Sequence, residues 1–121
     1  MYNLMIVDDS NIIRNRIARY EANAPFKVVA KASDGAEALV FFKKGNINLV
    51  TMDLTMPHMD GLECIQELIK LDPNVKILVV SALSDKSTGI KALKYGARGF
   101  LCKPFGEQEL LDALQKVIDS D

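Results

Sequence analysis

The feature that most constrains the fold is a set of short apolar runs, each of which ends abruptly at polar residues. The runs lie at 4–7, 48–52 and 76–80, and inside them apolar residues follow one another almost without interruption. A strand of this composition is buried on both faces, which is typical of a parallel sheet covered by helices on both sides. The sequence therefore predicts an α/β fold with these three strands buried on both faces.

The remaining segments complete a regular alternation of strand and helix. Two further strands are predicted at 27–32 and 99–102. Asp34 with Glu37 resembles a capping box, and Asp60 with Glu63 likewise marks a helix start. The predicted helices, in which apolar residues recur at helical spacing, span about 10–22, 35–42, 61–72, 86–95 and 107–118. The pattern predicts five βα units around one five-stranded parallel sheet with helices on both faces.

Composition and charge limit the classes of function. The 121 residues match one domain, and we expect a single domain over 1–121 with no effector domain attached. The net charge is −1, so no bulk attraction to nucleic acid or to a membrane surface is expected. We interpret Arg14, Arg16 and Arg19 as a solvated helix face. No apolar run reaches the ~18 residues of a membrane span, no signal peptide is present, and we expect a cytoplasmic protein.

Polar side chains follow four of the predicted strands, at the point where each strand ends. They are Asp8 and Asp9 after the first strand, Asp53 after the third, Ser81 after the fourth and Lys103 after the fifth. In an open parallel sheet, ligands bind in the crevice at the carboxyl ends of the strands. We therefore expect three carboxylates, a hydroxyl and an ammonium group to meet at one edge of the sheet.

The residue types at this edge fit phosphoryl transfer. Clustered carboxylates raise one another's pKa unless a cation is present, and such oxygen ligands select a hard divalent ion such as Mg²⁺. Asp53 is the natural nucleophile, because an ionised carboxylate can form an aspartyl phosphate. Mg²⁺ and Lys103 would then neutralise the transferred group, and Ser81 would donate a hydrogen bond to one of its oxygens.

With these residues in view, the chain resembles the receiver domain of two-component response regulators, in particular the stand-alone, CheY-like kind. The resemblance covers essentially the whole chain. It rests on LMIVDDS at 4–10, SDG with Glu37 and Ala38 at 33–38, MDL through MP to DG at 52–61, SA at 81–82, and GF through KPF at 99–105. The resemblance implies a flavodoxin-like (βα)5 fold with strand order 2-1-3-4-5.

The resemblance also implies a role for each acidic residue. Asp53 would accept the phosphoryl group from a phosphohistidine on a sensor histidine kinase. Asp9 and Asp53 would hold Mg²⁺ directly, together with the backbone carbonyl of Thr55. Asp8 would hold the same ion through a water molecule. Such a domain phosphorylates and dephosphorylates itself, so we expect a signalling module and not an enzyme.

The remaining site residues would form a switch. The resemblance implies that Ser81 and Lys103 contact the phosphoryl group and that Phe100 occupies an aromatic switch position, turning inward behind Ser81 as Ser81 moves. The surface made by helix 86–95, strand 99–102 and helix 107–118 would then bind a downstream protein. We expect a chemotaxis-type switch and a monomer, with a flagellar motor protein or a phosphotransfer protein as the target.

The same residues bear on other functions. A phosphorelay intermediate and a receiver cut from a longer regulator stay open. A Mg²⁺-dependent aspartyl-phosphate phosphatase typically carries its nucleophile on the first strand with a second Asp two residues on, whereas here Asp53 follows the third strand and position 55 is Thr. A flavin or nucleotide carrier needs a phosphate-binding loop after the first strand, where this chain has Asp8 and Asp9. A receiver that only docks is disfavoured because the acidic pocket is intact.

Overall fold

Five parallel strands form one sheet at the centre of the computed structural model, which describes residues 1–56, 59–82 and 86–120. The strands are β1 (Tyr2–Val7), β2 (Phe26–Ala32), β3 (Leu49–Met52), β4 (Lys76–Ala82) and β5 (Gly99–Lys103). They pair in the order β2-β1-β3-β4-β5, and each neighbouring pair is parallel. The predicted sheet and the predicted strand order are both confirmed.

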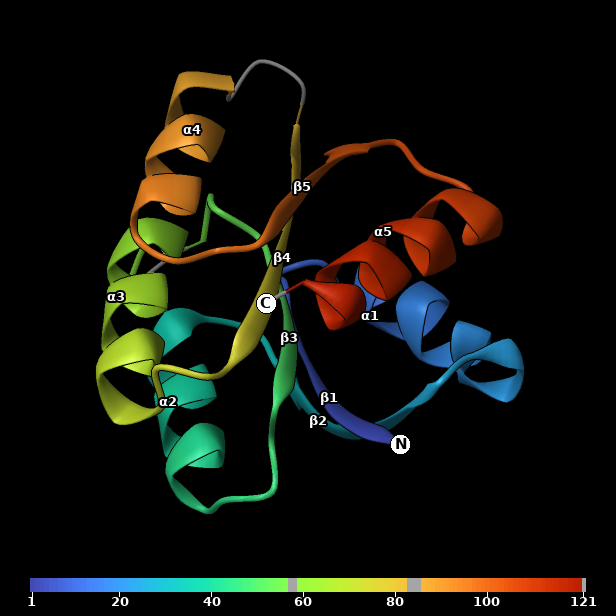
Figure 1. The fold of residues 1–121 in the computed structure, drawn as a ribbon, viewed down its shortest axis with the longest axis horizontal. Helices are drawn as coiled ribbons and strands as arrows, with labels where there is room; N and C mark the ends of the chain where they lie inside the picture. The colour runs from blue at the N-terminus through green and yellow to red at the C-terminus, as the bar shows by residue number, and fades with distance from the viewer. Residues whose placement is uncertain (57–58, 83–85, 121) are drawn as a thin grey trace.

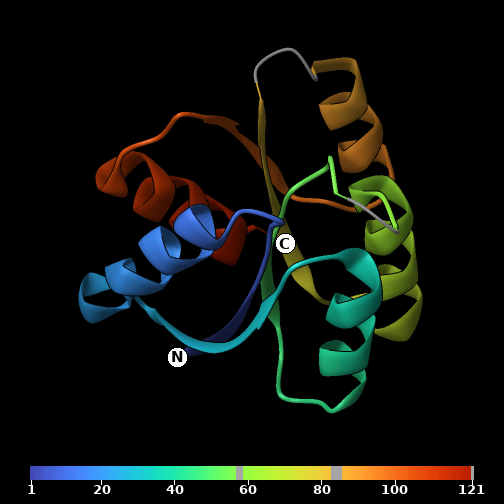
Figure 2. The same ribbon diagram turned by 180° about the vertical axis from the view of Figure 1, so that it is seen from behind.

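Helices cover both faces of this sheet (Figure 1). They are α1 (Asn11–Arg19), a 3₁₀ turn η1 (Tyr20–Asn23), α2 (Gly35–Lys43), α3 (Gly61–Leu71), α4 (Lys86–Lys94) and α5 (Glu107–Asp119). The view from behind shows α1 and α5 on one face and α2, α3 and α4 on the other (Figure 2). Among the described residues, none of these helices has the length and apolar character that crossing a bilayer requires.

Burial explains the continuous apolar runs. Every residue of β3 is buried, as are the last four of β1, because each of these strands has a neighbour on both sides and helices above and below. Leu4 and Ile6 join the core under α1 and α5, whereas Met5 and Val7 join the core under α2, α3 and α4. The edge strands β2 and β5 are less buried. The predicted burial of the inner strands is therefore confirmed.

Short polar side chains start two of the helices as the sequence predicts. The Asp34 carboxylate accepts a hydrogen bond from the Glu37 N–H at 2.8 Å, and Asp60 accepts one from the Glu63 N–H at 2.9 Å. Both bonds satisfy helix N–H groups that have no partner inside the helix. The return bond expected of a capping box is displaced by one residue, because Glu37 Oε1 accepts from the N–H of Ser33 at 2.8 Å.

One local feature differs from the sequence prediction, and a second was not predicted. The first helix was expected to run to about residue 22, but α1 ends at Arg19 and the chain tightens into η1. There the Glu21 carboxylate accepts a hydrogen bond from the N–H of Val28, which holds this turn against β2. The register of β1 with β2 also shifts, from Leu4 opposite Val28 to Met5 opposite Ala30, so one residue of β2 bulges out of the pairing.

One buried hydroxyl conflicts with the apolar interior and yields a stability prediction. Within the described part of the chain, Thr51 Oγ1 on β3 is buried and has no hydrogen-bond partner. Thr51→Val replaces this hydroxyl by a methyl group of the same shape, so we expect the free energy of unfolding to rise by about 1 kcal/mol. Thr51→Ser is the matched control, because it keeps the hydroxyl and loses a methyl group, and it should lower stability. Urea unfolding measures both, and a loss of stability in Thr51→Val would contradict the assignment.

Candidate functional site

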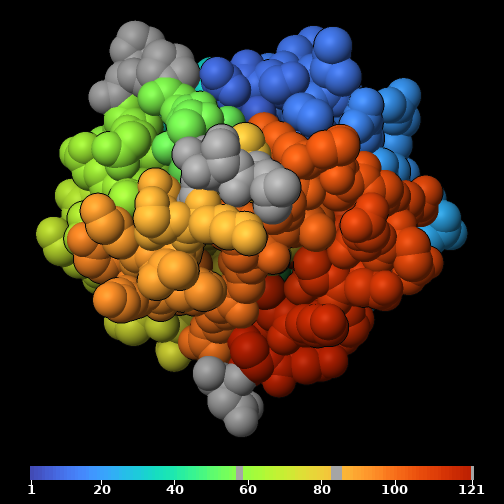
Figure 3. All heavy atoms as spheres, turned by 90° about the horizontal axis from the view of Figure 1, so that it is seen from above, coloured from blue at the N-terminus to red at the C-terminus, as the bar shows by residue number. Residues whose placement is uncertain are grey.

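Three strand ends bring the predicted site residues to one edge of the sheet. Asp8 and Asp9 follow β1, Asp53 follows β3, and Lys103 is the last residue of β5. These residues are far apart in the sequence, but β1 pairs with β3, and β3 pairs with β4, which in turn pairs with β5. The space-filling view of this edge shows the segments after β1 (blue), β3 (green) and β5 (orange) meeting on one face (Figure 3).

Asp8 is held by contacts to both of its carboxylate oxygens. Lys103 Nζ lies 2.9 Å from Asp8 Oδ2, and the backbone N–H of Ser10 donates to Asp8 Oδ1 at 2.9 Å. The Asp8 residue is only 2% exposed. A buried carboxylate needs such partners, since an unpaired charge away from water is costly. Asp8 is therefore fixed in position by the main chain on one side and by a cation on the other.

Asp53 is buried to the same extent but is less well paired. Thr55 donates to Asp53 Oδ1 from its backbone N–H at 3.3 Å and from its hydroxyl at 3.5 Å. Lys103 Nζ lies 3.8 Å from Asp53 Oδ2, which is farther than its distance to Asp8. Burial and the negative charge of Asp8 raise the pKa of Asp53 to about 6, although Lys103 and the Thr55 N–H lower it in part. Above that pH the carboxylate is ionised and can act as a nucleophile.

The three carboxylates form a group that fits a hard divalent cation. Asp8, Asp9 and Asp53 each place one oxygen within 4.8 Å of the others. Asp9 is exposed, which leaves the group open to solvent on one side. Oxygen-only ligands with room for water match the preferences of Mg²⁺. Thr55 is exposed and donates to Asp53, and its expected contribution of a carbonyl oxygen to the metal stays a prediction.

Ser81 lies on β4, the strand next to β3, and Phe100 lies on β5, the strand beyond it. Ser81 is fully buried near the end of β4, where it pairs with Cys102, the neighbour of Lys103. The pairing of Met52 with Val79 places Ser81 two residues beyond the last pair of β3 and β4, and therefore at the same edge as Asp53. Phe100 is half-buried in β5 and packs against the core under α2, α3 and α4.

Arg14 supports the site in a way that the sequence did not predict. Arg14 was interpreted as part of a solvated helix face, but it is half-buried and its Nη1 donates to the backbone carbonyl of Asp8 at 2.7 Å. Its Nη2 also contacts Asn11 Oδ1 at 3.3 Å. The interpretation is therefore wrong for Arg14, because its side chain reaches back from α1 to the main chain at Asp8. The sequence signal for this contact is the position of Arg14, about one helical turn after the Ser10 cap.

The raised pKa of Asp53 leads to a prediction about pH and stability. The native chain binds this proton more tightly than the unfolded chain, so without metal its free energy of unfolding falls as pH rises from about 4 to above 6. Asp53→Asn removes that titration. We expect the variant to exceed the parent by about 1–2 kcal/mol at pH 8 in chelator, after allowing for screening by water. Below pH 4 the difference should vanish. Urea unfolding across pH tests this, and a parent that is the more stable at pH 8 would contradict it.

Comparisons with known proteins agree with this geometry. The sequence profile of the family described as "Response regulator receiver domain" matches residues 4–115. The chemotaxis protein CheY of Thermotoga maritima is 40% identical over 114 residues, which make up 94% of this chain and 95% of that protein. The chemotaxis protein CheY of Listeria monocytogenes is 38% identical over 116 residues, covering 96% of this chain and 98% of that one.

Solved structures show the same fold. A chain in the CheX–CheY–BeF3–Mg²⁺ complex from Borrelia burgdorferi matches with a TM-score of 0.92 and 31% identity, over 98% of this chain and 90% of that chain. The chemotaxis protein CheY4 of Vibrio cholerae matches with a TM-score of 0.88 and 30% identity, over 97% of this chain and 98% of that chain. Because the family profile spans most of the sequence and these relatives match it almost from end to end, the chain belongs to the response regulator receiver domain family.

Proposed function

We propose that this chain is a phosphorylation switch in which Asp53 accepts a phosphoryl group from a phosphohistidine on a sensor histidine kinase. The observation that carries the proposal is the buried, incompletely paired Asp53 carboxylate, which lies beside Asp8 and Asp9 and within 3.8 Å of the Lys103 ammonium. The relatives that are named chemotaxis protein CheY support a role in two-component signalling of the chemotaxis type.

The transfer itself balances as a displacement at phosphorus. An oxygen of the Asp53 carboxylate forms the new P–O bond, the P–N bond of the phosphohistidine breaks, and the imidazole leaves with the electron pair. Bound Mg²⁺ would supply positive charge next to the transferred oxygens. In this proposal Asp9, Asp53 and the carbonyl of Thr55 hold the ion, and Asp8 holds it through water. The Borrelia burgdorferi complex, which contains BeF3 and Mg²⁺, supports the choice of Mg²⁺ as the ion.

Two other side chains would act on the phosphoryl group. Lys103 already neutralises part of the charge of Asp8 and Asp53, and a phosphoryl group on Asp53 would add negative charge within reach of the same ammonium. The Ser81 hydroxyl lies at the same edge of the sheet and would donate to a phosphoryl oxygen. The polar contacts of the phosphorylated site would thus be made by β4 and β5 as well as by β3.

The output would be a change in the surface of α4, β5 and α5. Phe100 lies on β5 and packs towards α4, so a change near Lys103 and Ser81 can reach this surface through the strand that carries both Phe100 and Lys103. A downstream protein, a flagellar motor protein or a phosphotransfer protein, would bind there. We further propose that the chain is a cytoplasmic monomer that binds no nucleic acid. It would phosphorylate and dephosphorylate itself and would not act as an enzyme on other molecules.

Intact-mass analysis tests the proposed acceptor. The chain is incubated with Mg²⁺ and a small acyl phosphate, and we expect one added phosphoryl group, because the Asp53 carboxylate is ionised at neutral pH and belongs to the three carboxylates that could hold the ion. Asp53→Asn should take up none, and neither should the parent in excess chelator. Lys103→Met should label at least 10-fold more slowly, since it removes the cation next to the new charge.

Asp60→Asn is the matched control for these variants. Asp60 is also an aspartate of the β3–α3 region, but its side chain accepts from the Glu63 N–H and lies outside the acidic group. The Asp60→Asn chain should therefore label at the rate of the parent. Equal labelling of Asp53→Asn and the parent would contradict the proposal.

A further inference from the structure

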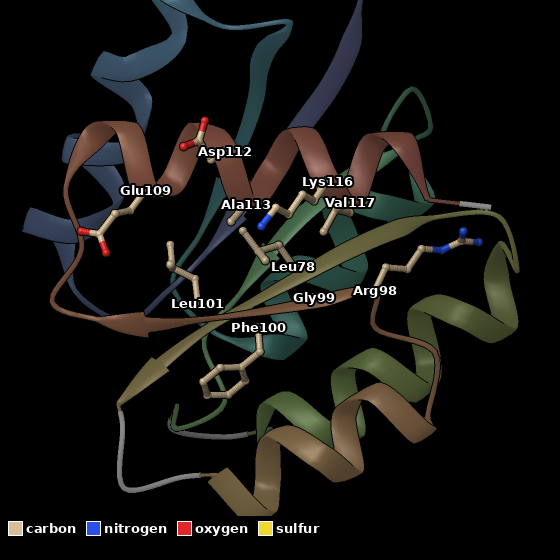
Figure 4. Close-up of a pocket in the computed structure, with 10 residues that line it drawn as sticks. All are labelled: Leu78, Arg98, Gly99, Phe100, Leu101, Glu109, Asp112, Ala113, Lys116 and Val117. Atoms are coloured by element: carbon tan, nitrogen blue, oxygen red, sulfur yellow. The ribbon is translucent and has the colours of Figure 1, made fainter.

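The ring of Phe100 occupies the space that a side chain at position 89 would need. A Cβ atom built on Gly89 would lie 2.4 Å from Phe100 Cε2 and 2.5 Å from Phe100 Cδ2. Both distances are far below van der Waals contact, so the ring rests directly on the backbone of α4. The close-up shows the Phe100 ring on the α4 side of β5, whereas Leu101 points to the α5 side (Figure 4).

The backbone of α4 does not itself require glycine at this position. Gly89 is buried within the helix and has no positive φ, in contrast to Gly45 at +92° and Gly96 at +119°. Glycine weakens a helix relative to alanine because it loses more conformational freedom on folding. The contact with the Phe100 ring gives a physical reason for a glycine in the middle of a nine-residue helix.

A hollow that the Phe100 ring helps to line lies beside this contact. A cavity of about 230 Å³ is lined by Lys86, Gly89, Ile90, Leu93 and Phe100. Ile90 and Leu93 are 57% and 45% exposed, so the hollow opens at the surface of α4. The Phe100 ring is therefore packed on one side by the helix backbone and has free volume nearby.

The ring is also connected to the phosphorylation site through its strand. Phe100 pairs with Val79 on β4, and two residues further along the same ladder Ser81 pairs with Cys102. Lys103, the next residue of β5, makes the ion pairs with Asp8 and Asp53. A change in the packing of Phe100 thus acts on the short strand that carries the cation of the site.

We propose that Gly89 is a positioning residue that sets the resting position of the Phe100 ring and thereby the threshold of the switch. A side chain at position 89 would occupy the space in which the Phe100 ring rests, but it would not affect states in which the ring lies elsewhere. It would therefore shift the population of the chain towards those states. The resting position of the ring is a property of the unphosphorylated chain alone. Its effect on the threshold rests on the proposed function, in which Phe100 changes position when Asp53 is phosphorylated.

A double-mutant cycle in stability tests the contact without any phosphorylation. Gly89→Ala should lower the thermal midpoint of the parent, because the new Cβ meets the ring. In the Phe100→Ala background the same substitution should raise the midpoint by about 4 °C, since only the gain in helix propensity remains. Ser87→Ala, at an exposed position of α4, should have the same effect in both backgrounds. An equal effect of Gly89→Ala in the two backgrounds would overturn the proposal.

Fluorine NMR then reports the position of the ring directly. The chain contains five phenylalanines, so a chain labelled with fluorophenylalanine should give five signals, and the Phe100→Leu variant identifies the one from Phe100. In Gly89→Ala we expect the Phe100 signal to shift more than the other four. Ser87→Ala changes an exposed position of α4 without meeting the ring and should leave the Phe100 signal in place. An unchanged Phe100 signal in Gly89→Ala would overturn the proposal.

The threshold is tested with beryllofluoride, an anion that can stand in for a phosphoryl group, in the presence of Mg²⁺. Calorimetric titration should show Gly89→Ala binding beryllofluoride at least about fivefold more tightly than the parent, and the difference should vanish in the Phe100→Ala background. If the parent and Gly89→Ala bind beryllofluoride equally tightly, the coupling between Gly89 and the site is overturned, but the proposed function is not. A parent that neither binds beryllofluoride nor takes up a phosphoryl group would overturn both, whereas the stability cycle and the fluorine signal would still decide the resting contact.

Discussion

Two buried carboxylates share one ammonium group, and the rest of the site depends on how that charge is divided. Lys103 lies closer to Asp8 than to Asp53, and the Ser10 N–H occupies the second oxygen of Asp8. Asp8 is thus compensated, whereas Asp53 keeps a raised pKa because it is buried next to another negative charge. The same imbalance makes Asp53 the carboxylate that benefits most from an added cation and the one best placed to react.

The sheet makes this arrangement possible at low cost to the fold. Parallel strands end at the same edge, so charged residues that directly follow a buried strand gather without any local motif. The strands themselves carry the apolar burial, with β1 and β3 covered on both faces. Stability and chemistry are therefore separated along each strand: the apolar residues build the core, and the polar residue after them builds the site. The unpartnered Thr51 hydroxyl is an exception within the described core.

The sequence was sufficient to predict what depends on residue type and period, but not what depends on contacts. The inner strands, the helix caps at Asp34 and Asp60, and the meeting of Asp8 with Asp53 and Lys103 all follow from patterns in the chain. The strand order came from the family resemblance. Arg14 was assigned to solvent because the helical pattern alone does not show that its side chain reaches the Asp8 carbonyl. The packing of Phe100 on Gly89 joins two elements whose approach no local pattern encodes.

The most direct test of the central claim is to locate the acceptor residue chemically. After incubation with Mg²⁺ and an acyl phosphate, borohydride reduces an aspartyl phosphate to homoserine, and peptide mass spectrometry identifies the converted position. We predict homoserine at position 53, and at neither of the two neighbouring carboxylates, Asp8 and Asp9. Conversion at another aspartate, or a phosphoryl group that resists borohydride, would contradict the assignment of Asp53 as the residue on which the switch is built.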